Sequence, residues 1–134
     1  MRAFCAALTL AFWPFVAPAQ EGDPIEGKEI FQDFCAVCHG VAAGGGGPMA
    51  QALRTTPPDL TALAEGNGGT FPAGRVVRRI DGREPLLSHG GEMPLFGRYF
   101  EGPERVPLKA ETGQPILTSQ PIADLVAWLE TVQR

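Results

Sequence analysis

Cys35, Cys38 and His39 are the residues of this sequence whose types and spacing could do chemistry together, in the string CAVCH at 35–39. On a helix, residues three apart lie on adjacent turns of one face. The two sulfurs could therefore reach the two vinyl groups of one porphyrin and form thioethers. His39, the next residue, would then present its imidazole to the iron as the proximal ligand. A Cys-x-x-Cys-His string is typical of covalent c-type haem attachment, so we expect one covalently bound haem c.

Other uses of the two cysteines fit the sequence less well. A thioredoxin-like dithiol needs a βαβ context, and no strand pattern flanks Cys35 and Cys38. A zinc site with His39 would need further ligands, and only His89 remains among the histidines. A disulfide between residues three apart on a helix would be strained. These alternatives are weaker than haem attachment.

The residues alone leave the second axial ligand of the iron open. Met93 lies in a glycine-rich turn at 89–94 and is followed directly by Pro94, so this loop could bring its sulfur close to the haem and hold it fixed. His89 offers an imidazole instead, and an open or water-bound position is the third possibility. A methionine can also simply fill a gap in a core. We favour Met93 as the distal ligand and expect Met49 to serve in packing.

Arginines could pair with the haem propionates, because a guanidinium group suits a carboxylate partner. We expect one of four to do so and the others to be solvated surface, and the sequence does not distinguish among them: Arg75, Arg78, Arg79 and Arg98.

The pattern of the chain predicts short helices joined by irregular loops. Predicted helical segments run from Asp23 to about Gly40, over 49–53, after Asp59, over 71–81, and from a Ser119 cap to the end of the chain. The glycine run 44–47 can hold neither helix nor strand. Residues 84–120 show no convincing helix or strand, which suits a stretch with a function or one that wraps a cofactor. So little regular structure implies that a large apolar group fills the middle.

Residues 1–19 are typical of a secretory signal peptide. Arg2 gives a positive start, residues 3–16 are apolar except for Thr9, and residues 17–19 form a small-x-small cleavage pattern. The apolar run is shorter than the ~20 residues that a membrane-spanning helix needs. We therefore expect cleavage after residue 19, export to the periplasm, and a soluble, monomeric domain at 20–134. A retained N-terminal anchor is the alternative.

The mature chain would be acidic. Of the 11 Lys and Arg residues only Arg2 lies in the signal, so residues 20–134 hold 10 basic and 15 acidic side chains, a formal charge of 10 − 15 = −5. Lys28 and Lys109 are the only lysines. This balance argues against nucleic acid as a partner, which requires clustered basic residues. It also argues against a docking face built from a ring of lysines.

Taken together, these motifs resemble a class I c-type cytochrome, the bacterial monohaem cytochrome c, over the whole mature domain. The attachment string at 35–40, the Gly-Pro pair at 47–48, the segment 58–61 and the Met-Pro pair at 93–94 are all similar to segments of that family. The resemblance implies an all-α cytochrome c fold, with three to five short helices and long loops wrapped around one haem.

The same resemblance assigns roles to single residues. It implies that the carbonyl of Pro48 accepts a hydrogen bond from His39 and so orients this proximal ligand. It also implies that Met93 is the distal iron ligand. Gly27 and Phe31 would face residues 125–129 where the first and last helices of the fold cross.

The function implied is one-electron transfer between redox partners, not enzymatic catalysis. A periplasmic dehydrogenase or quinol-oxidising complex would be the donor, and an oxidase or other acceptor would take the electron. Two alternatives stay open: a haem subunit of a larger redox complex, and a gas- or peroxide-binding haem protein with an open sixth site. The stretch 97–118 is longer than a minimal member of the family needs, and partner recognition or cover for the haem edge would explain it.

Overall fold

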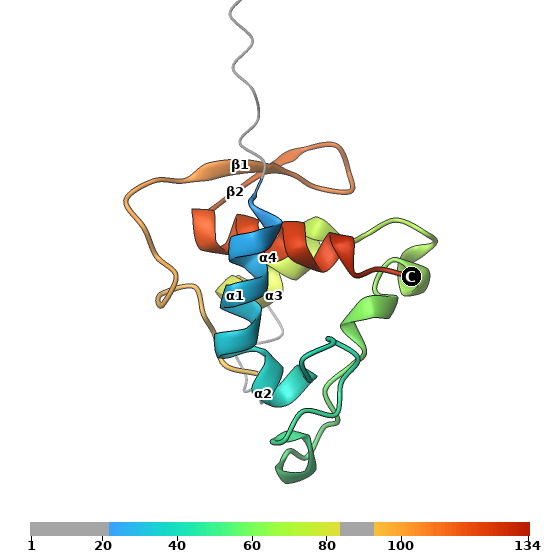
Figure 1. The fold of residues 1–134 in the computed structure, drawn as a ribbon. Coiled ribbons are helices and arrows are strands. Elements are labelled where there is room, and N and C mark those ends of the chain that lie inside the picture. The colour runs from blue at the N-terminus through green and yellow to red at the C-terminus, as the bar shows by residue number, and fades with distance from the viewer. Residues whose placement is uncertain (1–21, 84–92) are drawn as a thin grey trace, which may run out of the picture.

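The computed structural model describes residues 22–83 and 93–134 of the chain (Figure 1). Its elements in chain order are α1 (Pro24–Phe34), α2 (Ala36–His39), the 3-10 helices η1 (Ala50–Ala52), η2 (Leu60–Ala62) and η3 (Glu65–Asn67), α3 (Ala73–Asp81), β1 (Val106–Lys109), β2 (Pro115–Thr118) and α4 (Gln120–Thr131). The described chain is thus mostly helix and loop, as predicted. None of its helices is long and apolar enough to cross a bilayer. The predictions for residues 1–19 and for His89 lie outside the described residues.

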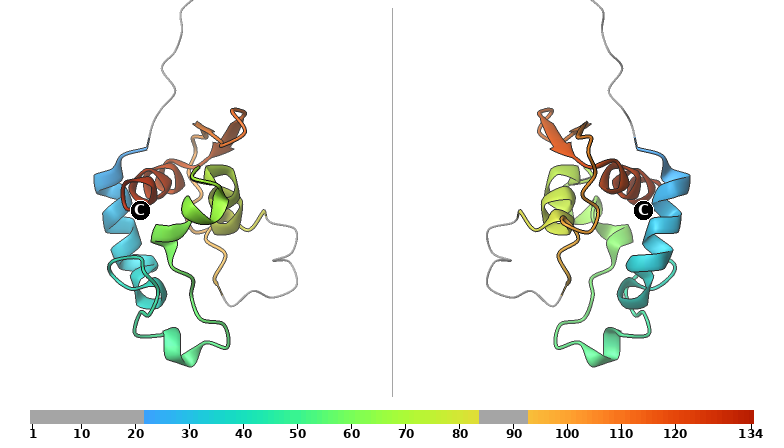
Figure 2. Two further views of the ribbon diagram at one scale, coloured as in Figure 1. Left: turned by 90° about the vertical axis from the view of Figure 1, so that its right-hand side faces the viewer. Right: turned by 90° about the vertical axis from the view of Figure 1, so that its left-hand side faces the viewer.

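Helices α1 and α4 pack closely across each other, and this crossing carries the core (Figures 1 and 2). Gly27 lies at the closest approach, because a Cβ built there would come within 1.9 Å of the carbonyl oxygen of Asp124. Next to it, the rings of Phe31 and Trp128 lie 4.4 Å apart. Asp23 caps α1 as predicted, since its carboxylate accepts the backbone N–H of Ile25 at 2.8 Å. The predicted crossing of the first and last helices is confirmed.

Helix α3 occupies most of the predicted segment 71–81 and packs on α4. Val76, Val77 and Ile80 point into the core. Gly82 ends the helix in the left-handed conformation, with φ of +84°, which glycine adopts without strain. The helix predicted over 71–81 is confirmed.

A two-stranded antiparallel hairpin contradicts the prediction that residues 84–120 hold no strand. β1 pairs with β2 from Val106↔Thr118 to Lys109↔Pro115. The chain reverses through residues 110–114, and Gly113 adopts a φ of +80° there. The prolines of the two strands hid the hairpin, because a proline within a run argues against a central strand. In a two-stranded sheet each strand is an edge, so a residue without an N–H is tolerated.

Two helix ends differ in detail from the prediction. The first helix does not continue unbroken to Gly40, because Cys35 separates α1 from α2. Ser119 occupies the predicted N-cap position of α4, but its side chain makes no capping hydrogen bond. The predicted terminal helix is otherwise confirmed, and its residues Ile122, Leu125 and Leu129 are buried.

Candidate functional site

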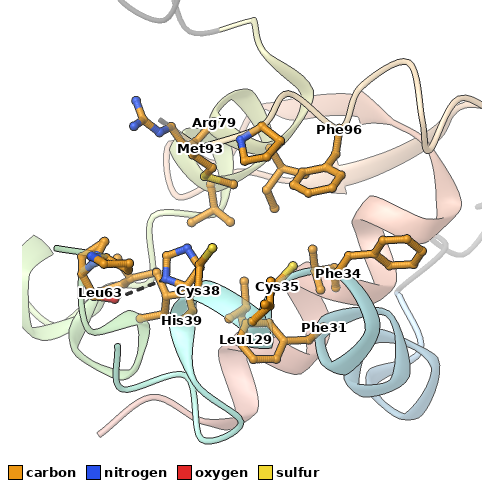
Figure 3. Close-up of a pocket in the computed structure, with 18 of the residues that line it drawn as sticks. Phe31, Phe34, Cys35, Cys38, His39, Leu63, Arg79, Met93, Phe96 and Leu129 are labelled. Carbon is orange, nitrogen blue, oxygen red and sulfur yellow. Dashed lines mark hydrogen bonds between the residues drawn. The ribbon is translucent and has the colours of Figure 1, made fainter. Parts of the chain in front are cut away.

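Helical backbone places Cys35, Cys38 and His39 at one site. The N–H of Cys35 donates to the carbonyl of Phe31, and the N–H of His39 donates to the carbonyl of Cys35, each at 2.9 Å. The chain therefore stays close to helical through the break between α1 and α2. All three side chains line one cavity of about 590 Å³ (Figure 3). The structure thus brings together the three residues of the sequence motif.

The glycine-rich loop that follows closes the end of α2. Gly45 and Gly47 donate their N–H groups to the carbonyls of His39 and Cys38, at 2.8 and 3.0 Å. A Cβ at Gly47 would come within 2.6 Å of two carbonyl oxygens of α2. The glycine run therefore passes close to the helix that carries the motif. The loop satisfies carbonyls that a helix end leaves without partners.

The cavity is lined mainly by apolar side chains from distant parts of the chain. Besides the motif, its lining includes Phe31 and Phe34 of α1, Leu60 and Leu63 around η2, Val76 and Ile80 of α3, Leu125 and Leu129 of α4, and Phe96. Figure 3 shows several of them, among them Phe31, Phe96 and Leu129, around an open centre. A flat apolar group larger than a side chain would complete this core, as the sequence predicted.

Met93 lies on the wall of the cavity that faces His39 (Figure 3). The chain after it is fixed from two sides. The N–H of Phe96 donates to the carbonyl of Ile80 at 2.8 Å, and a Cβ at Gly97 would come within 2.2 Å of the carbonyl oxygen of Asp81. This arrangement is compatible with the predicted distal ligand. Met49 is 46% exposed and does not line the cavity.

An aromatic cluster holds the same segment against α1, and the sequence analysis missed it. The ring of Phe34 lies 5.1 Å from that of Tyr99, 5.4 Å from that of Phe100 and 6.4 Å from that of Phe96. Three aromatic residues within 96–100, directly after the Met-Pro pair, were the available signal. The cluster positions Met93 by fixing the chain that leads away from it.

The carbonyl that faces His39 is that of Pro58, not that of Pro48 as predicted. Nδ1 of His39 lies 3.4 Å from this oxygen, and Pro58 also lines the cavity. Pro48 is exposed, within the loop that folds back over α2. The Pro-Pro pair before Asp59 was a usable signal, because Asp59 caps η2 and so fixes the chain just after Pro58. A carbonyl at Nδ1 favours the tautomer that leaves Nε2 free to bind metal.

Burial sets the protonation of the motif. It raises the pKa of Cys35 to about 11, and the neighbouring Cys38 pushes the pKa the same way. It also lowers the pKa of His39, against an opposing effect of the Pro58 carbonyl. The imidazole is therefore neutral at pH 7 and can act as a metal ligand. The Cys35 thiol is protonated at that pH, which argues against a reactive redox dithiol.

Two of the four candidate arginines, Arg75 and Arg79, line the cavity. Arg78 points to another side of α3, near Glu111, and Arg98 lines a separate, smaller pocket. The structure thus narrows the expected propionate partner to the first two.

The residues present fit a covalently attached haem better than the alternatives. The two thiols are free and adjacent to a neutral imidazole, at the edge of an apolar cavity. Among residues 22–83 and 93–134, no group of three or more His, Cys, Asp or Glu side chains could hold a metal ion. No strand flanks the motif in the described chain, so the βαβ context of a thioredoxin-like site is missing.

Comparison with models of known protein families shows which family the chain resembles. The model of the family described as Cytochrome c matches residues 25–133, which span the motif, the cavity and the last helix. No curated protein and no solved structure matches this chain.

Proposed function

We propose that this chain, which belongs to the cytochrome c family, is a single-haem electron carrier. The proteins of this family bind haem and transfer electrons between redox proteins. Cys35 and Cys38 hold the haem through thioethers, His39 is the proximal iron ligand, and Met93 is the distal one. When bound, haem c supplies an iron that alternates between the ferric and ferrous states. The observation that carries the proposal is the position of His39 and Met93 on facing walls of one cavity.

The residues around the site suit electron transfer more than ligand binding. With His39 and Met93 both committed, no coordination position is left for a substrate. A thioether ligand raises the reduction potential. The apolar lining, including Phe31, Leu125 and Leu129, excludes water and disfavours the more highly charged oxidised state.

The place of work and the partners are also part of the proposal. The signal-like segment 1–19 supports export to the periplasm, with a mature domain at 20–134. A periplasmic dehydrogenase or quinol-oxidising complex would then reduce the protein, and an oxidase or other acceptor would oxidise it. N-terminal sequencing of the exported protein should start at Gln20, and a start at Met1 would show that the segment is retained.

The test is the optical spectrum of the purified haem protein, oxidised and reduced, with and without carbon monoxide. We expect a weak long-wavelength sulfur-to-iron band in the oxidised protein and no response of the reduced protein to carbon monoxide. Met93→Ala should lose this band and bind carbon monoxide. Met49→Ala is the matched control, because Met49 lies outside the cavity, and it should behave like the parent protein.

The opposite result would overturn the carrier proposal. A clear spectral shift when carbon monoxide is added to the reduced parent protein would show an open or labile sixth position. The protein would then be better described as a gas- or peroxide-binding haem protein.

A further inference from the structure

A second pocket, of about 150 Å³, lies near the point where the hairpin leads into α4. Its lining combines the end of α3, the segment 97–101, the chain before β1, and the start of α4: Asp81, Arg83, Gly97, Arg98, Glu101, Arg105, Ser119 and Ile122. None of these residues lines the large cavity. The pocket is therefore a separate site, and most of the residues that line it are charged or polar.

Three arginines converge on this pocket in a chain that is acidic overall. Arg83 is held in place, since it pairs with Asp81 and donates to the carbonyl of Leu117 at 3.0 Å. Arg105 approaches Glu101 only loosely, at 3.9 Å. Arg98 has no ion-pair or hydrogen-bond partner among the described residues. Positive charge is thus gathered here beyond what the neighbouring carboxylates neutralise, which favours an anion as ligand.

Ser119 points to the same kind of ligand independently. Ser119 is 3% exposed, and its hydroxyl oxygen has no hydrogen-bond partner among the described residues. A serine at an N-cap normally turns its hydroxyl to the first N–H groups of its own helix, but Ser119 makes no such capping hydrogen bond, and it is one of the residues around the pocket. A buried hydroxyl without a partner is costly, and a bound oxyanion would accept its hydrogen bond.

The start of α4 adds a third attraction. This helix has 12 residues, and Ser119 and Ile122 in its first turn both line the pocket. The N-terminus of a helix carries partial positive charge and N–H groups without partners inside the helix, so it favours anions. The arginines lie outside α4, whereas Ser119 and the helix N-terminus belong to its start, and all of them surround one small volume.

The carboxylates in the lining decide which oxyanion fits. Asp81 already accepts the backbone N–H and the Nε of Arg83, whereas the Glu101 side chain is 61% exposed and only loosely paired. Sulfate has no proton at neutral pH and would be repelled by Glu101. Hydrogen phosphate carries an O–H that can donate to this carboxylate, while its other oxygens accept from the arginines and Ser119.

We propose that the pocket between α3, the hairpin and the start of α4 binds a phosphate group, through Arg98, Arg105 and Ser119, with Glu101 selecting phosphate over sulfate. The phosphate is either inorganic or the terminal group of a larger molecule. This site goes beyond the proposed electron-transfer function and does not depend on it. Its ligand would fix segment 97–101, which continues from Met93, against α4.

The test is isothermal titration calorimetry of the haem protein with inorganic phosphate, glycerol phosphate and sulfate, at one ionic strength set with chloride. We expect saturable binding of phosphate and weaker binding of sulfate. Tighter binding of glycerol phosphate than of inorganic phosphate would identify a phosphate carried by a larger molecule, and the reverse would identify the free ion. Arg98→Gln should weaken binding about tenfold, the effect of one charge-assisted hydrogen bond.

Matched variants separate the site from general charge and stability effects. Lys109→Gln removes the same charge from β1 outside the pocket, and should leave phosphate affinity unchanged. Ser119→Ala should weaken phosphate binding. Thr118→Val should not, because Thr118, whose hydroxyl also has no hydrogen-bond partner among the described residues, does not line the pocket. Glu101→Gln should reduce the preference for phosphate over sulfate. The proposal is overturned if the parent protein binds no phosphate, or if Arg98→Gln and Ser119→Ala bind it like their controls.

Discussion

Arg75 and Arg79 show how helical phase decides the role of a residue. Both line the large cavity, whereas Arg78 does not. A positive charge beside a redox centre disfavours the oxidised state, which is the more positive one. The two cavity arginines should therefore raise the reduction potential, and Arg78 should act on it less.

Replacing Arg79 by glutamine tests this difference. We expect the reduction potential of the haem protein to fall by roughly 20–50 mV, which corresponds to about 1 kcal/mol or less for a one-electron couple at a hydrated site. Redox titration measures the change. Arg78→Gln on the same helix is the control, and an equal fall in both variants would contradict a specific role for the cavity side of α3.

At the scale of single residues, the sequence predicted which residues form the site better than it predicted which residues contact one another. The haem-attachment motif is local, so its spacing alone predicted a shared site for Cys35, Cys38 and His39. The partner of His39 was predicted wrongly, because the contact joins His39 to Pro58, 19 residues later. The course of the intervening loop decides which of several prolines lies next to His39, and the Asp59 cap after the Pro-Pro pair was the one local signal for it.

Elements separated in sequence are joined by the carboxylate of Glu111. It lies in the turn of the hairpin and accepts the N–H of Gly74, in the first turn of α3, at 2.7 Å. Burial raises its pKa, but this N–H, its own backbone N–H, Arg78 and Arg75 together outweigh burial and lower the pKa below the ordinary value of 4.5. The hairpin thus supplies a negative charge where a helix N-terminus favours one.

Removing this charge should destabilise the protein in a pH-dependent way. Glu111→Gln should cost about 0.5 kcal/mol at neutral pH, since the group is solvent-exposed and screened. A carboxyl group with a lowered pKa stabilises fully above its unfolded-state pKa and loses that contribution as pH falls through the folded-state value. The difference from the parent protein should therefore be constant above pH 4.5 and shrink below it.

Urea unfolding at several pH values measures this difference. Glu29→Gln on the exposed side of α1 is the charge-matched control, and it should not reproduce the pH dependence. A gap between parent and Glu111→Gln that stays the same under acid conditions would exclude an electrostatic role for the contact.

Most elements were predictable because their ends are marked by local chemistry. Asp23 and Asp59 cap the helices that they precede, and Gly82 ends α3 in a conformation that suits glycine. The hairpin was missed because its stability comes from tertiary contacts that sequence periodicity does not report. Val106 and Thr118 are buried at one end of the ladder, and Arg83 and Glu111 tie the hairpin to other segments.

The charge of the whole molecule has an uneven distribution. The chain 20–134 has a formal charge of −5, whereas Arg75 and Arg79 lie at the large cavity and three further arginines line the small pocket. At low ionic strength the screening length is about 30 Å, so an approaching reagent senses the whole molecule. Near 0.1 M salt the length is about 10 Å, and charges close to the cavity dominate.

The rate of electron exchange with small charged oxidants should reveal which charge governs approach. We expect oxidation of the reduced haem protein by a trivalent cationic cobalt complex to slow by about a few-fold when salt is raised from 0.01 to 0.1 M. Oxidation by ferricyanide, an anion, should accelerate over the same range, because salt screens its repulsion from the acidic molecule. Stopped-flow spectroscopy measures both rates, and an uncharged oxidant provides the control. If salt instead accelerated the cationic oxidant and slowed ferricyanide, Arg75 and Arg79 would control access even at low salt. A natural partner would then present an acidic face to the cavity instead of a basic one.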